Sequence, residues 1–115
     1  MRFCVGAHAA VAEQDMQRPL VDAALTDSRA ARISEGLKAT LAFLEVMTLR
    51  HADLNVENAK AVFRSGVSAE ALRDPIAVSA FFNTVTRYGE ALDFALPTTK
   101  EFERAANILR KAAVA

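Results

Sequence analysis

Apolar residues recur at intervals of three and four along most of this chain, and that spacing constrains its fold more than any other feature. Between residues 29 and 49, one helical stripe carries Ile33, Leu37, Leu41, Leu44 and Thr48. No stretch alternates apolar and polar residues as a half-buried strand would, and no internal repeat or low-complexity linker interrupts the pattern. The sequence therefore predicts an all-α protein.

Short polar residues and prolines divide this pattern into helices. Pro19 and Pro75 each suit the first position of a helix, so a new helix is expected to begin at each of them. The predicted segments are residues 3–14, 19–25, 29–49, 56–63, 69–73 and 75–94, and a final helix that begins after Thr98. On the segment 75–94, the residues expected to face the core are Ala77, Phe81, Val85, Tyr88 and Leu92.

Several helix ends carry recognisable capping residues. Asn55 and Ser68 are good N-caps, and Thr98 with Glu101 has the pattern of a capping box. Gly66 stands where a residue of left-handed conformation would end a helix. Gly36 lies inside a predicted helix, where glycine costs about 1 kcal/mol relative to alanine. It either marks a close helix crossing or is simply tolerated, and tolerance is the simpler expectation.

Length and composition exclude several classes of protein. With 115 residues, the chain is expected to form one domain over residues 1–115. Its 14 basic and 14 acidic residues balance, so no excess of positive charge favours nucleic acid. No segment approaches the ~20 apolar residues of a membrane helix. A single cysteine forms neither an internal disulfide nor a zinc site, which is typical of a cytoplasmic protein, and we expect no metal or cofactor.

The only thiol, Cys4, stands four residues before one of the two histidines, His8. Residues four apart lie one above the other on a helix, so the two side chains could form a thiolate–imidazole pair. The first turn of a helix also stabilises a thiolate through its free N–H groups and its dipole. The alternative is that Cys4 is a small core residue and His8 an ordinary hydrogen-bonded histidine, and the spacing alone favours this alternative.

Two other groups of polar residues have simpler interpretations. His51 follows a long predicted helix and is expected at the surface, where its cationic form would interact well with the helix C-terminus. Asn83 and Arg87 are four residues apart and could bind a carboxylate or a phosphate. Such a pair more often joins a helix to its neighbours or to another subunit, so we expect a structural role.

Two motifs nevertheless point to a known family. The stretch Phe3-Cys4-Val5-Gly6-Ala7-His8-Ala9-Ala10 resembles the second half of the C-x-[FY]-C-x-x-x-H active-site helix of alkylhydroperoxidase D-like proteins. Farther along, Gly66-Val67-Ser68 and Phe82-Asn83-Thr84-Val85-Thr86-Arg87 resemble that family's aG-[LV]-S turn and the helix that carries its F-N and Arg residues. The motifs frame residues 3–94 in the family's order. The chain thus resembles an alkylhydroperoxidase D-like protein of the carboxymuconolactone decarboxylase superfamily.

This resemblance implies a thiol-dependent hydroperoxide reductase of antioxidant defence. Cys4 matches the peroxidatic thiol, and His8 matches the histidine that relays protons together with a glutamate from an earlier helix. The position of the resolving cysteine falls on Met1, and the segment that would carry the glutamate is not in this sequence. The chain is therefore expected either to be truncated before the family's N-terminal helices or to be a natural, degenerate member. In both cases, recycling Cys4 needs an outside thiol reductant or a neighbouring subunit's cysteine.

The resemblance also implies a homo-oligomer, a trimer or a hexamer, that associates through apolar helices. Two alternative functions stay open. One is a decarboxylase-type lyase that acts on a small lactone acid, for which His8 would matter and Cys4 would not. The other is an oligomeric scaffold whose site has lost its activity.

Overall fold

The computed structural model describes residues 2–95 and 97–114, and within these ranges the chain is helical, with no strand. This confirms the predicted all-α class. The elements in chain order are α1 (Arg2–Ala12), α2 (Arg18–Thr26), α3 (Glu35–Leu49), the short 3₁₀ helix η1 (His51–Asp53), α4 (Val56–Arg64), α5 (Ala69–Ala91) and α6 (Thr99–Val114). None of the helices in these ranges is both long and apolar enough to cross a membrane.

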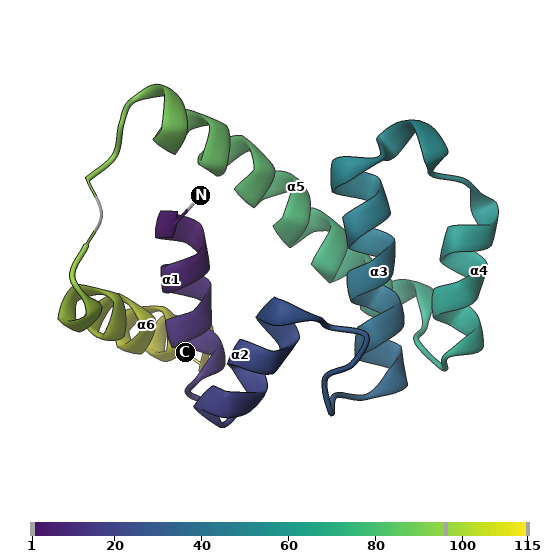
Figure 1. Ribbon diagram of the computed structural model, residues 1–115, viewed down its shortest axis with the longest axis horizontal. Helices are drawn as coiled ribbons and strands as arrows, with labels where there is room; N and C mark the ends of the chain where they lie inside the picture. Colours follow the sequence, from purple (N-terminus) through teal and green to yellow (C-terminus); the bar gives the residue numbers. More distant parts are fainter. Residues whose placement is uncertain (1, 96, 115) are drawn as a thin grey trace.

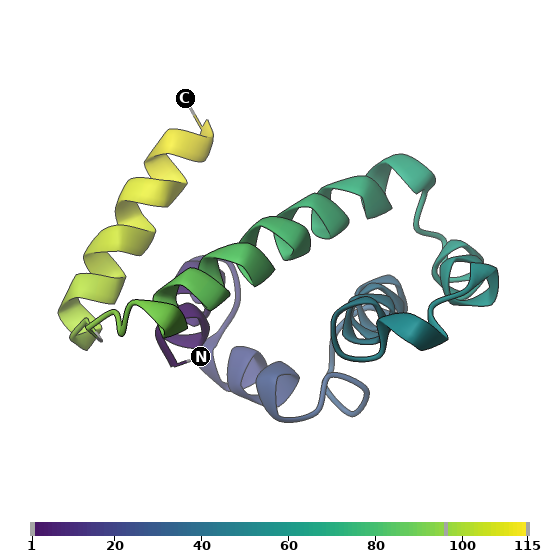
Figure 2. The same ribbon diagram turned by 90° about the horizontal axis from the view of Figure 1, so that it is seen from above.

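The long helix α5 joins two groups of helices. Its N-terminal half lies against α3, which also packs against α4, and its C-terminal half extends toward α1 (Figure 1). Helix α1 in turn packs against α6, so α1 stands between α6 and α5 (Figure 2). The C-terminal half of α5 meets α1, and its N-terminal half is held by α3 and α4. The position of α1 relative to α5 therefore depends on how the N-terminal half of α5 is held.

A small apolar core holds the N-terminal half of α5. Phe43 of α3, Val62 of α4 and Leu72 of α5 are buried together, and Val62 is fully inaccessible. Burial of side chains of this size stabilises the folded chain by about 1.5–3 kcal/mol each. Partly buried residues surround the three: Ala39, Leu44, Met47, Ala59, Val67 and Ile76.

Gly36 on α3 lies at a close approach. A Cβ atom at this position would come within 3.0 Å of Val67 Cγ2, which belongs to the segment between α4 and α5. Val67 itself packs against the core. The structure thus favours a close approach at Gly36, to the segment between α4 and α5 and not to a crossing helix, because a Cβ atom there would require Val67 to shift by a few tenths of an ångström.

Phe102 fixes the packing of α6 on α1. Its ring occupies the place of a side chain at Gly6, where a Cβ atom would lie 2.8 Å from Phe102 Cε2. One turn farther along α6, Ala106 is almost completely buried. Small residues on both helices thus let the two backbones approach closely around one aromatic ring.

Polar contacts join α6 to the end of α1. Gln14 Nε2 donates a hydrogen bond to Asn107 Oδ1 at 3.1 Å, and a guanidinium nitrogen of Arg110 lies 3.2 Å from Asp15 Oδ1. Arg110 also donates to the backbone oxygen of Gln14 at 3.3 Å. Except for Gln14, which is partly buried, these groups are solvent-exposed, so they align the two helices more than they stabilise the fold.

The predicted capping residues are confirmed. The Asn55 side chain accepts a hydrogen bond from the backbone N–H of Glu57 at 2.9 Å, and Ser68 Oγ accepts one from Ala71 at 3.1 Å. Gly66 has a φ angle of +89°, the left-handed conformation that its position at the end of α4 requires.

The helix predicted over residues 29–49 begins later, at Glu35. Ser34 caps it, with its Oγ accepting from the backbone N–H of Leu37 at 3.2 Å. Upstream, Asp27 Oδ1 accepts from the backbone N–H of Arg29 at 2.9 Å, and this local bond favours a turn over a helix. Ile33 therefore lies before α3 and not on its apolar stripe.

The two helices predicted over residues 69–73 and 75–94 form one continuous helix, α5, that ends at Ala91. Pro75 lies inside it and has no N–H to bond the preceding turn. Leu72 and Ile76, on either side of the proline, both contribute to the core, and their burial offsets the cost of the missing bond. Tertiary packing has thus overridden the local signal for a helix start.

The core-facing stripe predicted on this segment is also wrong. Phe81, Tyr88 and Leu92 are mostly exposed, and the buried residues of α5 are Leu72 and Gly89. The predicted stripe lies opposite Leu72 on the helix, and Gly89 lies at its edge.

The capping box at the start of α6 should respond to pH. The backbone N–H and the hydroxyl of Thr98 donate to Glu101 Oε2 at 2.7 and 2.8 Å. The backbone bond first, and then the hydroxyl bond, hold the pKa of Glu101 below its ordinary value of 4.5. Because this pKa is lower than in the unfolded chain, the carboxylate stabilises the folded chain above the unfolded pKa. This contribution is lost as the pH falls through the folded pKa.

An NMR titration of the Glu101 side chain checks this prediction. We expect a midpoint below 4.5 in the wild type and a partial upward shift in Thr98→Ala, which removes only the hydroxyl bond. A wild-type midpoint at or above 4.5 would contradict the capping geometry.

Gly6→Val should destabilise the fold because the new side chain would overlap the Phe102 ring. Overpacking of this kind costs about 1–3 kcal/mol. Urea unfolding followed by circular dichroism measures the loss. In the double variant Gly6→Val, Phe102→Ala the overlap is absent, so the loss should be smaller than the sum of the two single losses; equal stability of wild type and Gly6→Val would show that the ring moves aside freely.

Candidate functional site

The face of α1 that carries Cys4 meets α5. Cys4 Sγ lies 3.2 Å from Thr86 Oγ1, although the two residues are 82 positions apart in the chain. The thiol is partly buried, and it belongs to the first turn of α1. The structure thus brings the predicted thiol of the first motif against a residue of the second.

His8 lies one turn farther along α1. Its Nδ1 is 2.7 Å from the backbone oxygen of Cys4, and its ring meets Phe82 edge-on with 4.2 Å between the ring centres. A carbonyl oxygen only accepts hydrogen bonds, so Nδ1 must carry the proton. Nε2 is left free to accept a proton in the neutral ring or to donate one in the cation.

The sequence predicted that Cys4 and His8 share one helix face, and they do. Their hydrogen bond, however, joins the imidazole to the Cys4 backbone oxygen and not to the thiol. The thiol takes its partner, the Thr86 hydroxyl, from the other helix. A direct thiolate–imidazole pair is therefore not the ground-state arrangement, and His8 would act on a molecule that reaches the thiol.

This arrangement has a definite chemical capacity. When Cys4 is ionised, the Thr86 hydroxyl can only donate, so it stabilises the thiolate. The N-terminal end of α1 adds a favourable dipole at the same place. His8 is exposed and has a free Nε2, which allows it to exchange a proton with solvent or with a leaving group.

Thr86 and Phe82 were not singled out from the sequence as site residues; only their membership of the second motif drew attention to them. Asn83, in contrast, has the structural role that was expected. Its Nδ2 donates to the Ser79 backbone oxygen at 2.9 Å and lies 3.4 Å from Thr48 Oγ1, which joins α5 to α3. His51 lies exposed in η1, away from Cys4, as expected.

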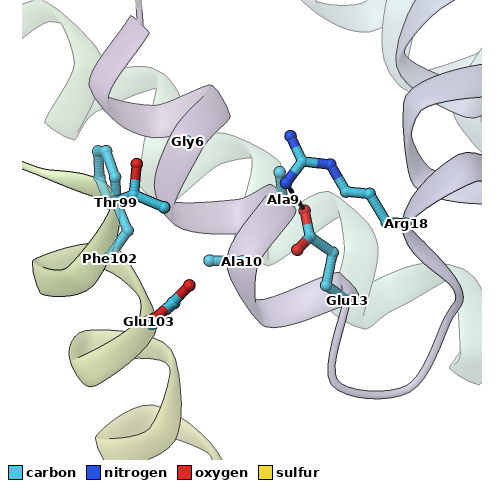
Figure 3. A pocket seen from close by; sticks show the side chains of 8 residues that line it. All are labelled: Gly6, Ala9, Ala10, Glu13, Arg18, Thr99, Phe102 and Glu103. Atoms are coloured by element: carbon cyan, nitrogen blue, oxygen red, sulfur yellow. Dashed lines mark ion pairs between the residues drawn. The ribbon is translucent and has the colours of Figure 1, made fainter.

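A cavity of about 250 Å³ opens between α1 and α6, on a part of α1 that carries neither Cys4 nor His8 (Figure 3). Glu13 and Arg18 form an ion pair at its rim, with 3.0 Å between their nearest charged atoms. Its lining residues are Gly6, Ala9, Ala10, Glu13, Arg18, Thr99, Phe102 and Glu103. The cavity belongs to the packing of α1 on α6 and does not reach the thiol.

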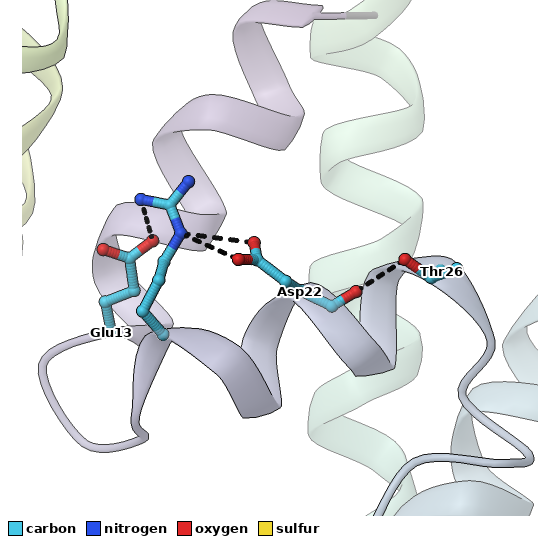
Figure 4. A network of polar contacts seen from close by, with 4 residues as sticks. Glu13, Asp22 and Thr26 are labelled. Carbon is cyan, nitrogen blue, oxygen red and sulfur yellow. Dashed lines mark hydrogen bonds and ion pairs between the residues drawn. The ribbon is translucent and has the colours of Figure 1, made fainter.

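The Arg18 guanidinium at this rim pairs with a second carboxylate. Its Nε also lies 3.2 Å from Asp22 Oδ1, so two carboxylates share one cation (Figure 4). The hydrogen bond with Asp22, then the charges of Asp22 and Glu13, raise the pKa of Arg18 above its ordinary value. With both neighbours neutralising it, Arg18 offers little attraction to a further anion.

Comparisons with protein-family models, with curated proteins and with solved structures find no match. In the part of the chain that the structure describes, no three His, Cys, Asp or Glu side chains come together as a metal site would require. The chemistry of the Cys4 site must therefore be argued from its own geometry.

Replacing the Thr86 hydroxyl should slow reactions of the thiolate. Thr86→Val keeps the shape of the side chain and removes its hydrogen bond to Cys4. Because one such bond is worth about 1 kcal/mol, we expect alkylation of Cys4 by iodoacetamide at fixed neutral pH to slow by roughly three- to tenfold.

The matched control is Thr84→Val. Thr84 lies on the same helix, but it is exposed and its hydroxyl bonds the Ala80 backbone oxygen. Its alkylation rate should equal that of the wild type. If the two variants react at the same rate, the Thr86 hydroxyl does not stabilise the thiolate.

Proposed function

We propose that this protein is a thiol-dependent hydroperoxide reductase of the alkylhydroperoxidase D-like kind, with Cys4 as the oxidised thiol and His8 as the proton donor. The observation that carries the proposal is the meeting of two motifs that are far apart in the sequence. Cys4 contacts Thr86 and His8 contacts Phe82, so each motif supplies half of one site. Nothing in the local sequence of α1 requires that meeting, which makes it independent support.

In the proposed reaction, the Cys4 thiolate attacks the terminal oxygen of a hydroperoxide. A sulfur–oxygen bond forms while the oxygen–oxygen bond breaks, and two electrons pass from sulfur to the peroxide. The thiolate becomes a sulfenic acid, and the leaving alkoxide takes a proton to become an alcohol. The cationic form of His8 supplies that proton from Nε2, because Nδ1 stays bonded to the Cys4 backbone oxygen.

Completing the cycle needs two further thiol groups. The first thiol condenses with the sulfenic acid, releases water and forms a mixed disulfide. The second thiol attacks this disulfide and regenerates Cys4. Cys4 is the only cysteine of the chain, and Met1, which takes the resolving position in the family pattern, lies outside the described residues. The first group therefore comes from an external thiol reductant or from a neighbouring subunit's cysteine, and an external thiol reductant restores the reduced state.

Assembly into a trimer or a hexamer is the second part of this proposal. The apolar side chains exposed on α5 support it, because they need a partner to leave water. A role in antioxidant defence would follow from the reaction itself.

The decisive experiment follows the consumption of cumene hydroperoxide in the presence of excess dithiothreitol. Wild type should consume the hydroperoxide well above the rate of the reductant alone, and Cys4→Ser should fall to that background. His8→Ala should retain part of the rate, with a loss of roughly a hundredfold or more, because the alkoxide must then take its proton from water. Equal rates for wild type and Cys4→Ser would overturn the proposal.

The same variants separate the two alternatives. A lyase that acts on a small lactone acid would keep its turnover in Cys4→Ser and lose it in His8→Ala. A scaffold without activity would show no hydroperoxide consumption above background. In that case Cys4 would react with iodoacetamide no faster than an unstructured cysteine peptide.

A further inference from the structure

One face of α5 exposes a continuous row of large apolar side chains. Val78, Phe81, Tyr88 and Leu92 have 52%, 63%, 62% and 65% of their surface exposed. Val85 lies in the same row and is partly buried. We call these five residues the α5 stripe.

The α5 stripe lies opposite the buried face of the same helix. Phe81 is half a turn around the helix from Leu72, which lies in the core. A helix that is apolar on two opposite faces is normally covered on both. Here the apolar core covers the face of α5 that carries Leu72. In the described part of the chain, the opposite face of α5 is turned toward solvent.

The spacing of the stripe is that of a coiled-coil seam. Steps of three and four residues alternate from Val78 to Leu92, which keeps every member on one line as two helices wind around each other. Asp74, one heptad before Phe81, and Asp93, just after Leu92, end the stripe on both sides. The seam is therefore bounded and spans about four turns of helix.

We propose that the α5 stripe binds the α5 stripe of a second copy of this chain in an antiparallel pair. This inference rests on the second part of the proposed function, the assembly of copies through α5, and does not depend on the reaction of Cys4, because no residue of the stripe carries out that reaction. Of the two assemblies named there, a hexamer can be built from two-fold pairs and a trimer cannot. The inference names the surface and the orientation of the contact, which neither the motifs nor the chemistry of Cys4 specify.

The exposed area agrees with a second copy as the occupant. Two aromatic and two aliphatic side chains exposed to this extent offer about 400 Å² of apolar surface in each copy. A pair would remove about 800 Å² of this apolar surface from water. The exposed small residues beside the stripe, Ala77, Thr84 and Ala91, would add to the buried area and bring it toward the roughly 1,200 Å² of the smaller specific interfaces. We therefore expect a reversible pair.

Charge favours the antiparallel orientation. With Val78 against Tyr88 of the partner subunit, and Phe81 against Val85 of the partner subunit, the two-fold axis passes at the level of Asn83. Arg73 then comes to the level just beyond Ala91 of the partner subunit, where α5 ends, so a cation lies near a negative helix C-terminus at both ends of the seam, while Asp74 lies level with Leu92 of the partner subunit. A parallel pair would bring equal charges to equal levels and align the two helix dipoles unfavourably.

The first test measures mass by sedimentation velocity over a range of protein concentrations. Wild type should form a pair, or an assembly built from pairs, and the double variant Phe81→Glu, Tyr88→Glu should stay a monomer with unchanged helix content. Leu49→Glu is the matched control, because Leu49 is 73% exposed on α3 and lies outside the stripe. A wild type that stays monomeric, or equal losses of association in the stripe and control variants, would overturn the proposal.

The second test measures orientation with single cysteines in a Cys4→Ser background. Thr84→Cys lies one residue from the axis, so the two thiols of an antiparallel pair are offset by only about 3 Å along the helices. In Val78→Cys this offset is about 15 Å. A short bismaleimide should therefore cross-link Thr84→Cys into dimers and leave Val78→Cys largely as monomers; efficient cross-linking of Val78→Cys, or none of Thr84→Cys, would overturn the antiparallel pair.

Discussion

The burial of Leu72 between Phe43 and Val62 is the contact on which the rest of the structure depends. It anchors α5 to α3 and α4, and together with Ile76 it keeps that helix continuous through Pro75. A break at the proline would redirect the C-terminal half of α5. The residues that meet α1 would then no longer stand where they do, so the apolar core sets the geometry of a site that lies outside it.

Continuity of α5 has a direct chemical consequence. The helix presents Thr86 to the Cys4 thiol and Phe82 to the His8 ring from two successive turns. The packing of α1 on Phe102 fixes the other half of the site from the opposite side. The thiol is thus held between two helices that are positioned independently, which gives it a hydroxyl donor that α1 alone could not supply.

The same helix carries apolar side chains on the face turned away from the core. The regular spacing of these side chains predicts that they are buried, but within one chain Phe81, Tyr88 and Leu92 are mostly exposed. A second copy would satisfy it without changing the fold. Phe81 also packs edge-on against Phe82, which contacts His8, so the exposed stripe and the candidate site are neighbours on α5.

The sequence by itself determined the features that rest on short-range hydrogen bonds: the helical class, the caps at Asn55, Ser68 and Thr98, and the left-handed Gly66. Each of these bonds joins groups within a few residues, so the local sequence contains all the partners. Tertiary structure alone decided the continuity of α5 through Pro75, the face of α5 that is buried and the pairing of Cys4 with Thr86. Those outcomes depend on which helix surfaces meet, and distant parts of the chain supply the surfaces.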